Sequence, residues 1–411
     1  MSLATQIFMC MVTTAAVLAL VGVQVSDALS CSGGGTVTTP QTLTTGTHTV
    51  DNCVISAAIT VTNAQLSITG GSSTTAGGKI TVNGGATVSV DGSTLGADLE
   101  VDGGTATVTG TTFSGAGRVY GIGIGSTSVS VSGSTFADTG NVAAQVYCTF
   151  GGSGTHTWSI TNNQFVGRGV VSLVSGTFSA LTFSSNNLVQ MTRVAGSITT
   201  AVTFGTVILP TASGVLQIAS NQASSSTFDI ASAGGLALLH LGSTTSSGTG
   251  PIVNVSANTG FAQIVSGAAS LSTGDSCTNP VVFSGNTATL TGAPNTLLVF
   301  DLRTASMSGC PVLISGNVYS ITHSDTGAAS GLVALSAMPK DSSSAMTVHG
   351  NTFTATTKGI VHSTLFLISG SGSVDFEYLV IKGNVLDITT EGGSANGISI
   401  EDVDFGKVAL S

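Results

Sequence analysis

Short segments in which apolar and polar residues alternate run along most of the chain. In segments 59–62, 66–69, 79–82 and 87–90, every second residue is Val, Ile or Leu, and the residues between them are Ser, Thr or Lys. A period of two residues is typical of β-strands with one buried face. Turn signals such as Asp91-Gly92 separate the segments. The pattern predicts an all-β protein.

A longer unit recurs in the second half of the chain. Residues 311–322 read PVLISGNVYSIT, and related copies occur at 280–286 (PVVFSGN), 346–351 (MTVHGN) and 379–384 (LVIKGN), with a looser copy at 251–258 (PIVNVSAN). Each copy predicts a short strand, a tight turn at Gly-Asn and a second strand.

The alternation within this unit also predicts which side chains are buried. One set of residues is expected to face the core, and the intervening set is expected to face outward. The expected core residues are Val312, Ile314, Tyr319 and Ile321, and the outward residues are Leu313, Val318 and Ser320.

The Asn of this unit, or a Ser or Thr in its place, returns at intervals of roughly 20–40 residues, which is typical of stacked repeats. These anchor positions are Thr111, Ser134, Asn163, Asn186, Asn221, Asn258, Asn286, Asn317, Asn351 and Asn384. A third strand precedes the unit, for example at 236–239, 297–300, 332–335 and 365–368. A propeller blade needs about 40–45 residues and four strands, so these intervals are too short and uneven for a propeller.

We therefore predict a single-stranded right-handed parallel β-helix of about ten or more coils. It spans 29–411 as one domain, since no linker or break in composition interrupts it. Residues 31–110 alone would also fit adjacent hairpins, but their continuity with the later repeat favours short coils.

Two interpretations of the recurrent Asn remain open at this point. An exposed turn uses Asn because it tolerates left-handed backbone angles. A buried Asn in stacked coils can instead hydrogen-bond to the Asn above and below it, as in Asn ladders. The return of one residue type at one place favours the ladder.

Residues 1–28 are expected to form a signal peptide. The run 8–25 is largely apolar, and Ser26-Asp27-Ala28 offers a cleavage site of small residues. The alternative is an uncleaved anchor, because the run is close to the length that spans a bilayer. After cleavage, the sequence predicts no integral membrane segment and an extracellular location, either secreted or at the cell surface.

The composition narrows the choice of partners. Only 7% of residues are charged, and 9 Lys and Arg stand against 19 Asp and Glu, for a net charge of −10. Globular domains usually carry about 25% charged residues. The acidic balance without basic clusters argues against nucleic acid and against anionic membranes. Apolar content of 41%, arranged in alternation, argues against disorder.

The cysteines suggest two disulfides. Cys31 and Cys53 bracket the first mature segment, whereas Cys277 and Cys310 hold nearly equivalent places in successive coils. Stacked coils lie about 4.8 Å apart, which is within the span of a disulfide. Cys148 is left over and is expected to be a buried, small apolar residue.

Residues for catalysis or cofactor binding do not form a recognisable motif. The acidic groups are Asp98-Leu99-Glu100-Val101-Asp102, which would place three carboxylates on one face of a strand, and Glu401-Asp402-Val403-Asp404. We expect both to be solvated outer faces. The histidines lack metal-ligand spacing, and no cofactor is predicted. Asn254-Val255-Ser256 is a glycosylation sequon.

The Ser-Gly-Asn coils resemble pectin-lyase-like right-handed β-helices and, more narrowly, the dispersed-gene-family surface proteins of trypanosomatid parasites. The segments that carry the resemblance are CTNPVVFSGN (277–286), CPVLISGN (310–317), VHGNTF (348–353) and VIKGNV (380–385). It covers most of 110–411 and implies a surface or secreted protein with an adhesive or matrix-binding role. Those proteins are much longer and carry membrane segments, and no catalytic residues are carried over.

The first functional hypothesis is a non-enzymatic extracellular β-helix that adheres to a host or matrix protein or to a glycan. The alternatives are a polysaccharide lyase or glycoside hydrolase, which needs two carboxylates about 5–10 Å apart, and an ice-binding protein, which needs an unbroken two-column Thr array. Because segment 407–411 aligns with 311–315, just before the next Gly-Asn, we also expect a truncated array that self-associates end to end.

Overall fold

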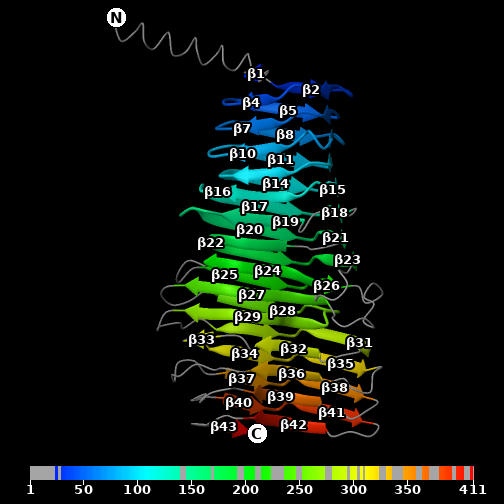
Figure 1. Ribbon diagram of the computed structural model, residues 1–411. Coiled ribbons are helices and arrows are strands. Elements are labelled where there is room, and N and C mark those ends of the chain that lie inside the picture. The colour runs from blue at the N-terminus through cyan, green and yellow to red at the C-terminus, as the bar shows by residue number, and fades with distance from the viewer. Residues whose placement is uncertain are drawn as a thin grey trace, which may run out of the picture.

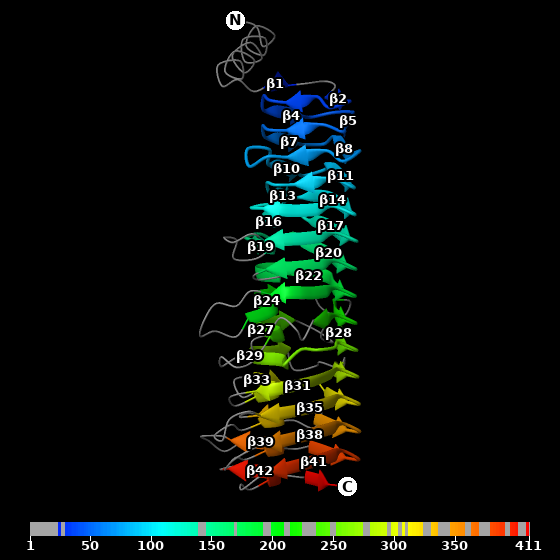
Figure 2. The same cartoon turned by 90° about the vertical axis from the view of Figure 1, so that its right-hand side faces the viewer.

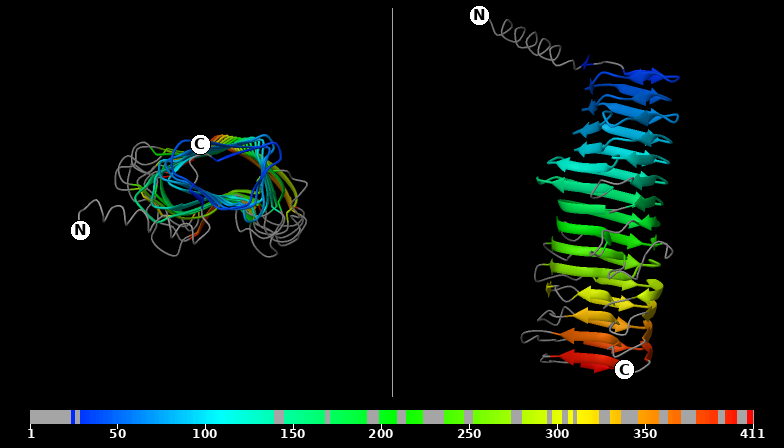
Figure 3. Two further views of the ribbon diagram at one scale, coloured as in Figure 1. Left: turned by 90° about the horizontal axis from the view of Figure 1, so that it is seen from above. Right: turned by 45° about the vertical axis from the view of Figure 1, so that its right-hand side comes forward.

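The computed structural model describes most of the chain as stacked β-strands. The described residues are 24–25, 29–138, 145–167, 171–191, 199–208, 214–223, 236–246, 252–273, 280–293, 297–302, 306–308, 311–323, 330–335, 346–357, 363–369, 379–390, 395–401 and 408–410. The strands form one long column of coils, with the earliest coils at one end and the latest at the other (Figures 1 and 2). Viewed along its axis, the column has a flattened oval outline (Figure 3).

Each coil contributes strands to three faces, and every pairing between strands is parallel. Face 1 contains β1 (Gln24–Val25), β4 (Gln41–Leu43), β7 (Ile59–Val61), β10 (Ile80–Asn83), β13 (Leu99–Asp102), β16 (Val119–Gly123), β19 (Val146–Phe150), the first part of β22 (Val171–Ser184), β24 (Thr199–Ile208), β27 (Leu236–Ser246), β29 (Gln263–Thr273), β32 (Leu297–Leu302), β33 (Ser306–Ser308), β36 (Ser330–Leu335), β39 (Ser363–Ser369) and β42 (Ala395–Glu401).

Face 2 follows face 1 in each coil. It contains β2 (Ser30–Ser32), β5 (Thr47–Asp51), β8 (Gln65–Thr69), β11 (Thr87–Asp91), β14 (Gly104–Thr109), β17 (Thr127–Ser132), β20 (Thr155–Thr161), the second part of β22, β25 (Val215–Ala219), β28 (Ile252–Ser256), β30 (Val281–Ser284), β34 (Val312–Ser315), β37 (Met346–His349), β40 (Leu379–Lys382) and β43 (Val408–Leu410).

Face 3 follows the anchor position and consists of shorter strands. It contains β3 (Thr36–Val37), β6 (Val54–Ile55), β9 (Ser73–Thr74), β12 (Thr94–Leu95), β15 (Thr112–Gly115), β18 (Thr135–Asp138), β21 (Gln164–Gly167), β23 (Asn187–Met191), β26 (Gln222–Ala223), β31 (Thr287–Ala293), β35 (Val318–His323), β38 (Thr352–Thr357) and β41 (Val385–Thr390). The protein is therefore an all-β parallel β-helix, as the sequence predicts.

The alternation of apolar and polar residues determines which side chains fill the interior of the solenoid. In β34 and β35, Val312, Ile314, Tyr319 and Ile321 are buried, whereas Val318 is 46% exposed, as predicted. Residues of one type often stack on their equivalents in the next coil, such as Phe113 on Phe136 with ring centroids 4.4 Å apart and Phe136 on Phe165 at 4.7 Å. The coil spacing thus matches the separation preferred by stacked rings.

The recurrent asparagines are buried and form a ladder. Asn258 illustrates the pattern, because its Nδ2 donates to Oδ1 of Asn286 at 2.9 Å and to the carbonyl oxygen of Ile218 at 3.0 Å. Its backbone N–H donates to the same Oδ1 of Asn286 at 3.1 Å. The same side-chain bond joins Asn163, Asn186, Asn221, Asn258, Asn286, Asn317, Asn351 and Asn384 in succession.

The anchor column extends further toward the N-terminus than the sequence analysis recognised. The N–H of Ser134 donates to Oδ1 of Asn163, and the N–H of Thr111 donates to Oγ of Ser134. Strand pairing places Ser93, Ser72 and Cys53 in the same column, each directly before its face 3 strand. The N–H of Cys53 donates to Oγ of Ser72 at 3.1 Å. Hydroxyls therefore replace the amide in the early coils.

The residue before each anchor has a left-handed backbone. Gly285, Gly316, Gly350 and Gly383 have φ values of 63°, 61°, 62° and 58°. The tight turn predicted at Gly-Asn therefore rests on the glycine, and the Asn itself points inward. In other coils the same conformation is imposed on residues with a Cβ, namely Asn162, Ser185, Ser220 and Ala257. Left-handed angles are unfavourable for such residues.

The expected bond between Cys31 and Cys53 is present, with Cα atoms 6.3 Å apart. Cys277 and Cys310 lie outside the described residues, so their pairing stays a prediction. Cys148 is buried and free. Most of the expected signal segment also lies outside the described residues, but Gln24–Val25 forms β1 and pairs with β4. At the other end, β43 pairs with β40 in the expected alignment, with Val408 opposite Leu379.

Breaking one rung of the ladder should destabilise the protein strongly. In Asn186→Ala, the side-chain amide and backbone N–H of Asn163 lose their shared acceptor, and the carbonyl of Ile160 loses a donor. Each buried polar group without a partner costs about 1–3 kcal/mol, so we expect a loss of about 3 kcal/mol or more in urea unfolding. Asn187→Ala is the matched control, because Asn187 is the next residue and is exposed. Equal losses in both variants would contradict the structural role of the ladder.

Placing glycine where a residue with a Cβ has a left-handed backbone should raise the free energy of unfolding. Ala257→Gly places glycine at a position with φ of 55° and should raise stability by about 0.5–1 kcal/mol. The reverse change, Gly285→Ala, at φ of 63°, should lower it by a similar amount. Thermal unfolding of both variants beside the parent would measure this, and shifts in the same direction would refute the argument.

Candidate functional site

Charged and aromatic side chains gather on the outer surface of face 1, near the N-terminal third of the solenoid. We call this group the charged–aromatic patch, and it comprises Lys79, Thr81, Asp98, Glu100, Arg118, Tyr120 and Tyr147. They belong to successive coils that contain β10, β13, β16 and β19. None of these side chains is fully buried, because the inward positions of the strands are taken by Ile80, Leu99, Val119 and Val146.

The parallel register brings the patch residues into two columns. Ile80, Leu99 and Val119 pair across coils, so the residues before them, Lys79, Asp98 and Arg118, align with charges of alternating sign. The residues after them form the second column, in which Thr81, Glu100, Tyr120 and Tyr147 pair in succession. Alternating charge within a column and directly opposed aromatic rings both stabilise sheet neighbours.

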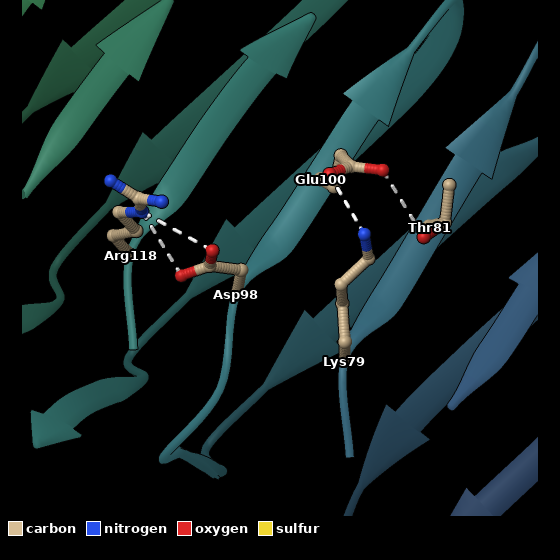
Figure 4. A network of polar contacts seen from close by, with 5 residues as sticks. All are labelled: Lys79, Thr81, Asp98, Glu100 and Arg118. Carbon is tan, nitrogen blue, oxygen red and sulfur yellow. Dashed lines mark hydrogen bonds and ion pairs between the residues drawn. The ribbon is translucent and has the colours of Figure 1, made fainter. Parts of the chain in front are cut away.

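Both carboxylates of the patch are engaged by cations (Figure 4). Nε of Arg118 donates to both carboxylate oxygens of Asp98, at 3.2 Å each. Nζ of Lys79 lies 2.9 Å from Oε2 of Glu100, and the hydroxyl of Thr81 lies 3.5 Å from Oε1. The four charges cancel, so the patch presents polar groups without a net charge.

Asp98 has a perturbed acidity. Burial raises the pKa of its carboxyl, and the nearby Arg118 guanidinium opposes this effect without overcoming it. Glu100, two residues later in β13, adds to the rise by repulsion between like charges.

The two tyrosines form an aromatic platform beside Arg118. The rings of Tyr120 and Tyr147 lie with centroids 5.3 Å apart, and Cζ of Arg118 lies 4.9 Å from the first centroid and 5.9 Å from the second. The Arg118 side chain is held to Asp98 through its Nε. Within the described part of the chain, its two Nη groups make no hydrogen bond, which leaves four N–H donors for a ligand.

Part of this site could be predicted from the sequence, and part of it could not. Glu100 and Asp102 lie on the outward face of β13, as expected, whereas Asp98 lies directly before the strand rather than within it. The partnership of Arg118 with Asp98 was missed, since it spans 20 residues. A signal did exist, because Lys79, Asp98 and Arg118 each stand directly before an alternating apolar segment. Asp402 and Asp404, of the other acidic group, lie outside the described residues.

The remaining candidates do not assemble into a site. Within the described ranges, no group of three His, Cys, Asp or Glu residues could hold a metal ion, and no helix is long and apolar enough to cross a membrane. Asn254 of the sequon occupies an outward position in β28. On face 2, one outward column contains Thr49, Ser67, Ser89, Thr107, Ser130, Ser159 and Thr182. Its serines, and Asp51 in the adjacent column, interrupt the two-column Thr array that ice binding would need.

Comparisons of this chain with protein-family models, with curated proteins and with solved structures found no match.

The two ion pairs of the patch should differ in strength. Asp98 and Arg118 are 22% and 27% exposed and meet through two contacts, whereas Lys79 is 44% exposed and meets Glu100, which is 16% exposed, through one contact. A double-mutant cycle with Asp98→Asn and Arg118→Met should give a coupling energy near the upper end of the range of about 0.2–1 kcal/mol for surface pairs. The matched cycle with Lys79→Met and Glu100→Gln should give a smaller value. The reverse order, measured by urea unfolding, would contradict the assigned geometry.

Proposed function

We propose that this protein is a non-enzymatic, secreted or cell-surface β-helix that binds neutral glycans through the charged–aromatic patch. The observation that carries the proposal is the pair of outward tyrosines, Tyr120 and Tyr147, beside an Arg118 side chain with free donors. An aromatic body with a polar rim suits a ligand that has both an apolar face and hydroxyl groups.

A sugar ring has this combination. Its C–H face can lie on a tyrosine ring. Its hydroxyl oxygens can accept hydrogen bonds from the Nη groups of Arg118, and its O–H groups can donate to Glu100 or Thr81. The compensated charges of the patch and the net charge of −10 favour a neutral glycan over an acidic one. Each coil also presents one side chain of the second column, so a chain of sugars could contact several coils.

The extracellular setting rests on three features. These are the expected signal peptide, the Cys31–Cys53 disulfide, which suits an oxidising compartment, and a surface of Ser and Thr with few charges. The finer resemblance to pectin-lyase-like and trypanosomatid surface proteins agrees with an adhesive role and is part of the proposal.

Removing the tyrosine rings should abolish most of the binding. Residues 29–411, secreted and purified, would first be applied to an array of neutral and acidic glycans. For a neutral glycan retained there, we expect Tyr120→Ala and Tyr147→Ala each to weaken binding at least about tenfold, because interface tyrosines contribute most when truncated. Titration calorimetry would measure the dissociation constants.

Two control variants distinguish a loss of the binding site from a general loss of folding. Thr107→Ala changes an exposed residue on face 2 and should leave binding unchanged. Arg118→Lys keeps the charge beside Asp98 but loses the planar guanidinium, so it should weaken binding while unfolding remains nearly unaffected. Retention of no glycan, or only of acidic glycans, would refute the proposal.

A polysaccharide-cleaving enzyme is the second candidate. It is favoured by the raised pKa of the Asp98 carboxyl, which lies two residues before the carboxylate of Glu100. The ion pairs with Arg118 and Lys79 argue for a structural role instead. The protein would be incubated with neutral and acidic polysaccharides, and reducing ends and unsaturated products would be measured. This measurement decides between an enzyme and a binding protein. Cleavage that Asp98→Asn abolishes would establish the enzyme.

A further inference from the structure

A histidine is enclosed in the solenoid directly behind the patch. His156 of β20 is 0% exposed, and its ring is stacked on Phe150 of β19 with centroids 3.6 Å apart. Phe178 of β22 lies against it with centroids 5.5 Å apart. Trp158, Phe150 and Phe178 contact one another edge to face, so the imidazole forms part of an aromatic cluster inside the coils.

Only one nitrogen of the His156 ring has a hydrogen-bond partner. Nε1 of Trp158 donates to the hydroxyl oxygen of Thr127 at 2.9 Å, and that hydroxyl lies 2.9 Å from Nδ1 of His156. Nε2 is buried without a hydrogen-bond partner among the described residues. A protonated ring must donate from both nitrogens, so its Nε2–H would be buried without an acceptor among those residues.

Among the described residues, no carboxylate packs against the ring to pair with the charge of its protonated form. The groups that face it are Thr127 from β17, Phe150 from β19, Trp158 from β20 and Phe178 from β22. The other titratable side chain that these strands turn inward is Cys148, and burial raises the pKa of its thiol, so it is neutral. Burial alone lowers the pKa of His156 to about 4.

The same cluster supports the strands that carry the tyrosines of the patch. Tyr147 and Phe150 belong to β19, so the ring that stacks on His156 and the ring exposed outside share one short strand. Gly121 follows Tyr120 in β16, and a Cβ at Gly121 would lie 2.5 Å from Phe150 and 2.6 Å from Trp158. The backbone of β16 therefore rests directly on the aromatic cluster, and a rearrangement of the cluster would displace both tyrosines.

We propose that protonation of His156 in an acidic compartment opens the coils around β16, β19 and β20 and thereby releases the ligand held on the patch. This regulation rests on the proposed glycan binding, whereas the opening itself can be measured without any ligand. Partner release on acidification is a known use of histidine, because its charge changes near physiological pH.

The sign of the pH dependence follows from the lowered pKa. The closed state holds His156 neutral, whereas an opened state would take up a proton near the ordinary pKa of about 6.5. The closed state therefore keeps its full stability above pH 6.5 and loses it as the pH falls toward about 4. In that window, the equilibrium constant for opening should rise by up to about tenfold for each pH unit.

The protein contains its own reporter of this opening. Trp158 is the only tryptophan of the chain, and its indole is hydrogen-bonded within the cluster. Fluorescence of residues 29–411 would be recorded from pH 7.5 to 3.5 without ligand, and the glycan retained on the array would be titrated at the same pH values. We expect a reversible red shift of the emission below about pH 6, together with at least about tenfold weaker binding at pH 4.5 than at pH 7.

Two variants test the assignment to His156. His156→Gln cannot take up a proton, so it should remove the fluorescence transition and the weakening of binding between pH 6.5 and 4. Because that variant could fold less well, the neutral aromatic variant His156→Phe provides a second measurement, with the same expected loss of pH dependence. His349→Gln, on an outward position of face 2, is the matched control and should keep the transition.

Each outcome decides between the two proposals. A transition that persists in both His156 variants, or its absence in the parent protein, overturns the acid opening and leaves glycan binding intact. A transition that depends on His156 while binding stays constant with pH overturns the release of ligand. If the array retains no glycan, the proposed function fails and the release fails with it, although the fluorescence result still stands for the opening.

Discussion

The solenoid depends on a hydrogen bond between identical side chains in successive coils. From Asn186 to Asn351, each Asn of the ladder donates from Nδ2 to the next Asn and to a backbone carbonyl, while its Oδ1 accepts both a side-chain and a backbone N–H from the preceding coil. An amide is the one side chain with both the donors and the acceptor for this arrangement. Since each of these rungs completes the one before it, the buried amides from Asn186 to Asn351 are satisfied and set the register of each new coil.

The Asn ladder explains which residue types flank each Asn in the sequence. For the Asn to point inward, the residue before it must take a left-handed conformation, which glycine adopts without strain. The alternation of apolar and polar residues on both sides of the Asn then places apolar residues at the inward positions. Charged residues are therefore found mainly on the outer surface. In the early coils, Ser and Thr replace Asn, and they offer one hydroxyl where the amide offers two donors and an acceptor. The Cys31–Cys53 bond lies at the end of the column where this weaker hydrogen bonding begins.

Much of the fold could be predicted because the determinants are local and repeated. The two-residue alternation, the Gly-Asn pair and the preceding strand identify a coil in each repeat, and the ladder follows once coils are stacked. Cys53, Ser72 and Ser93 were missed as members of the column because none of them is Asn and serine is too common in this chain to mark a position. The patch was harder to predict, since its pairs join coils 20 or 21 residues apart and depend on the register of loops whose lengths vary.

The core and the outer surface of the solenoid are coupled because only one layer of backbone separates them. A parallel β-helix has a single backbone layer between the core and solvent, so consecutive residues such as Tyr147 and Cys148 face opposite sides. A change in the core therefore reaches the surface through one residue rather than through a packed second layer. At most of the described coils, the buried side chains are apolar residues and the neutral polar groups of the anchor column, which carry no charge. At His156 the core contains a group with two charge states, and it lies beneath the strands that carry the tyrosine pair. The solenoid can thus be stable along its length and still respond to acid at one position.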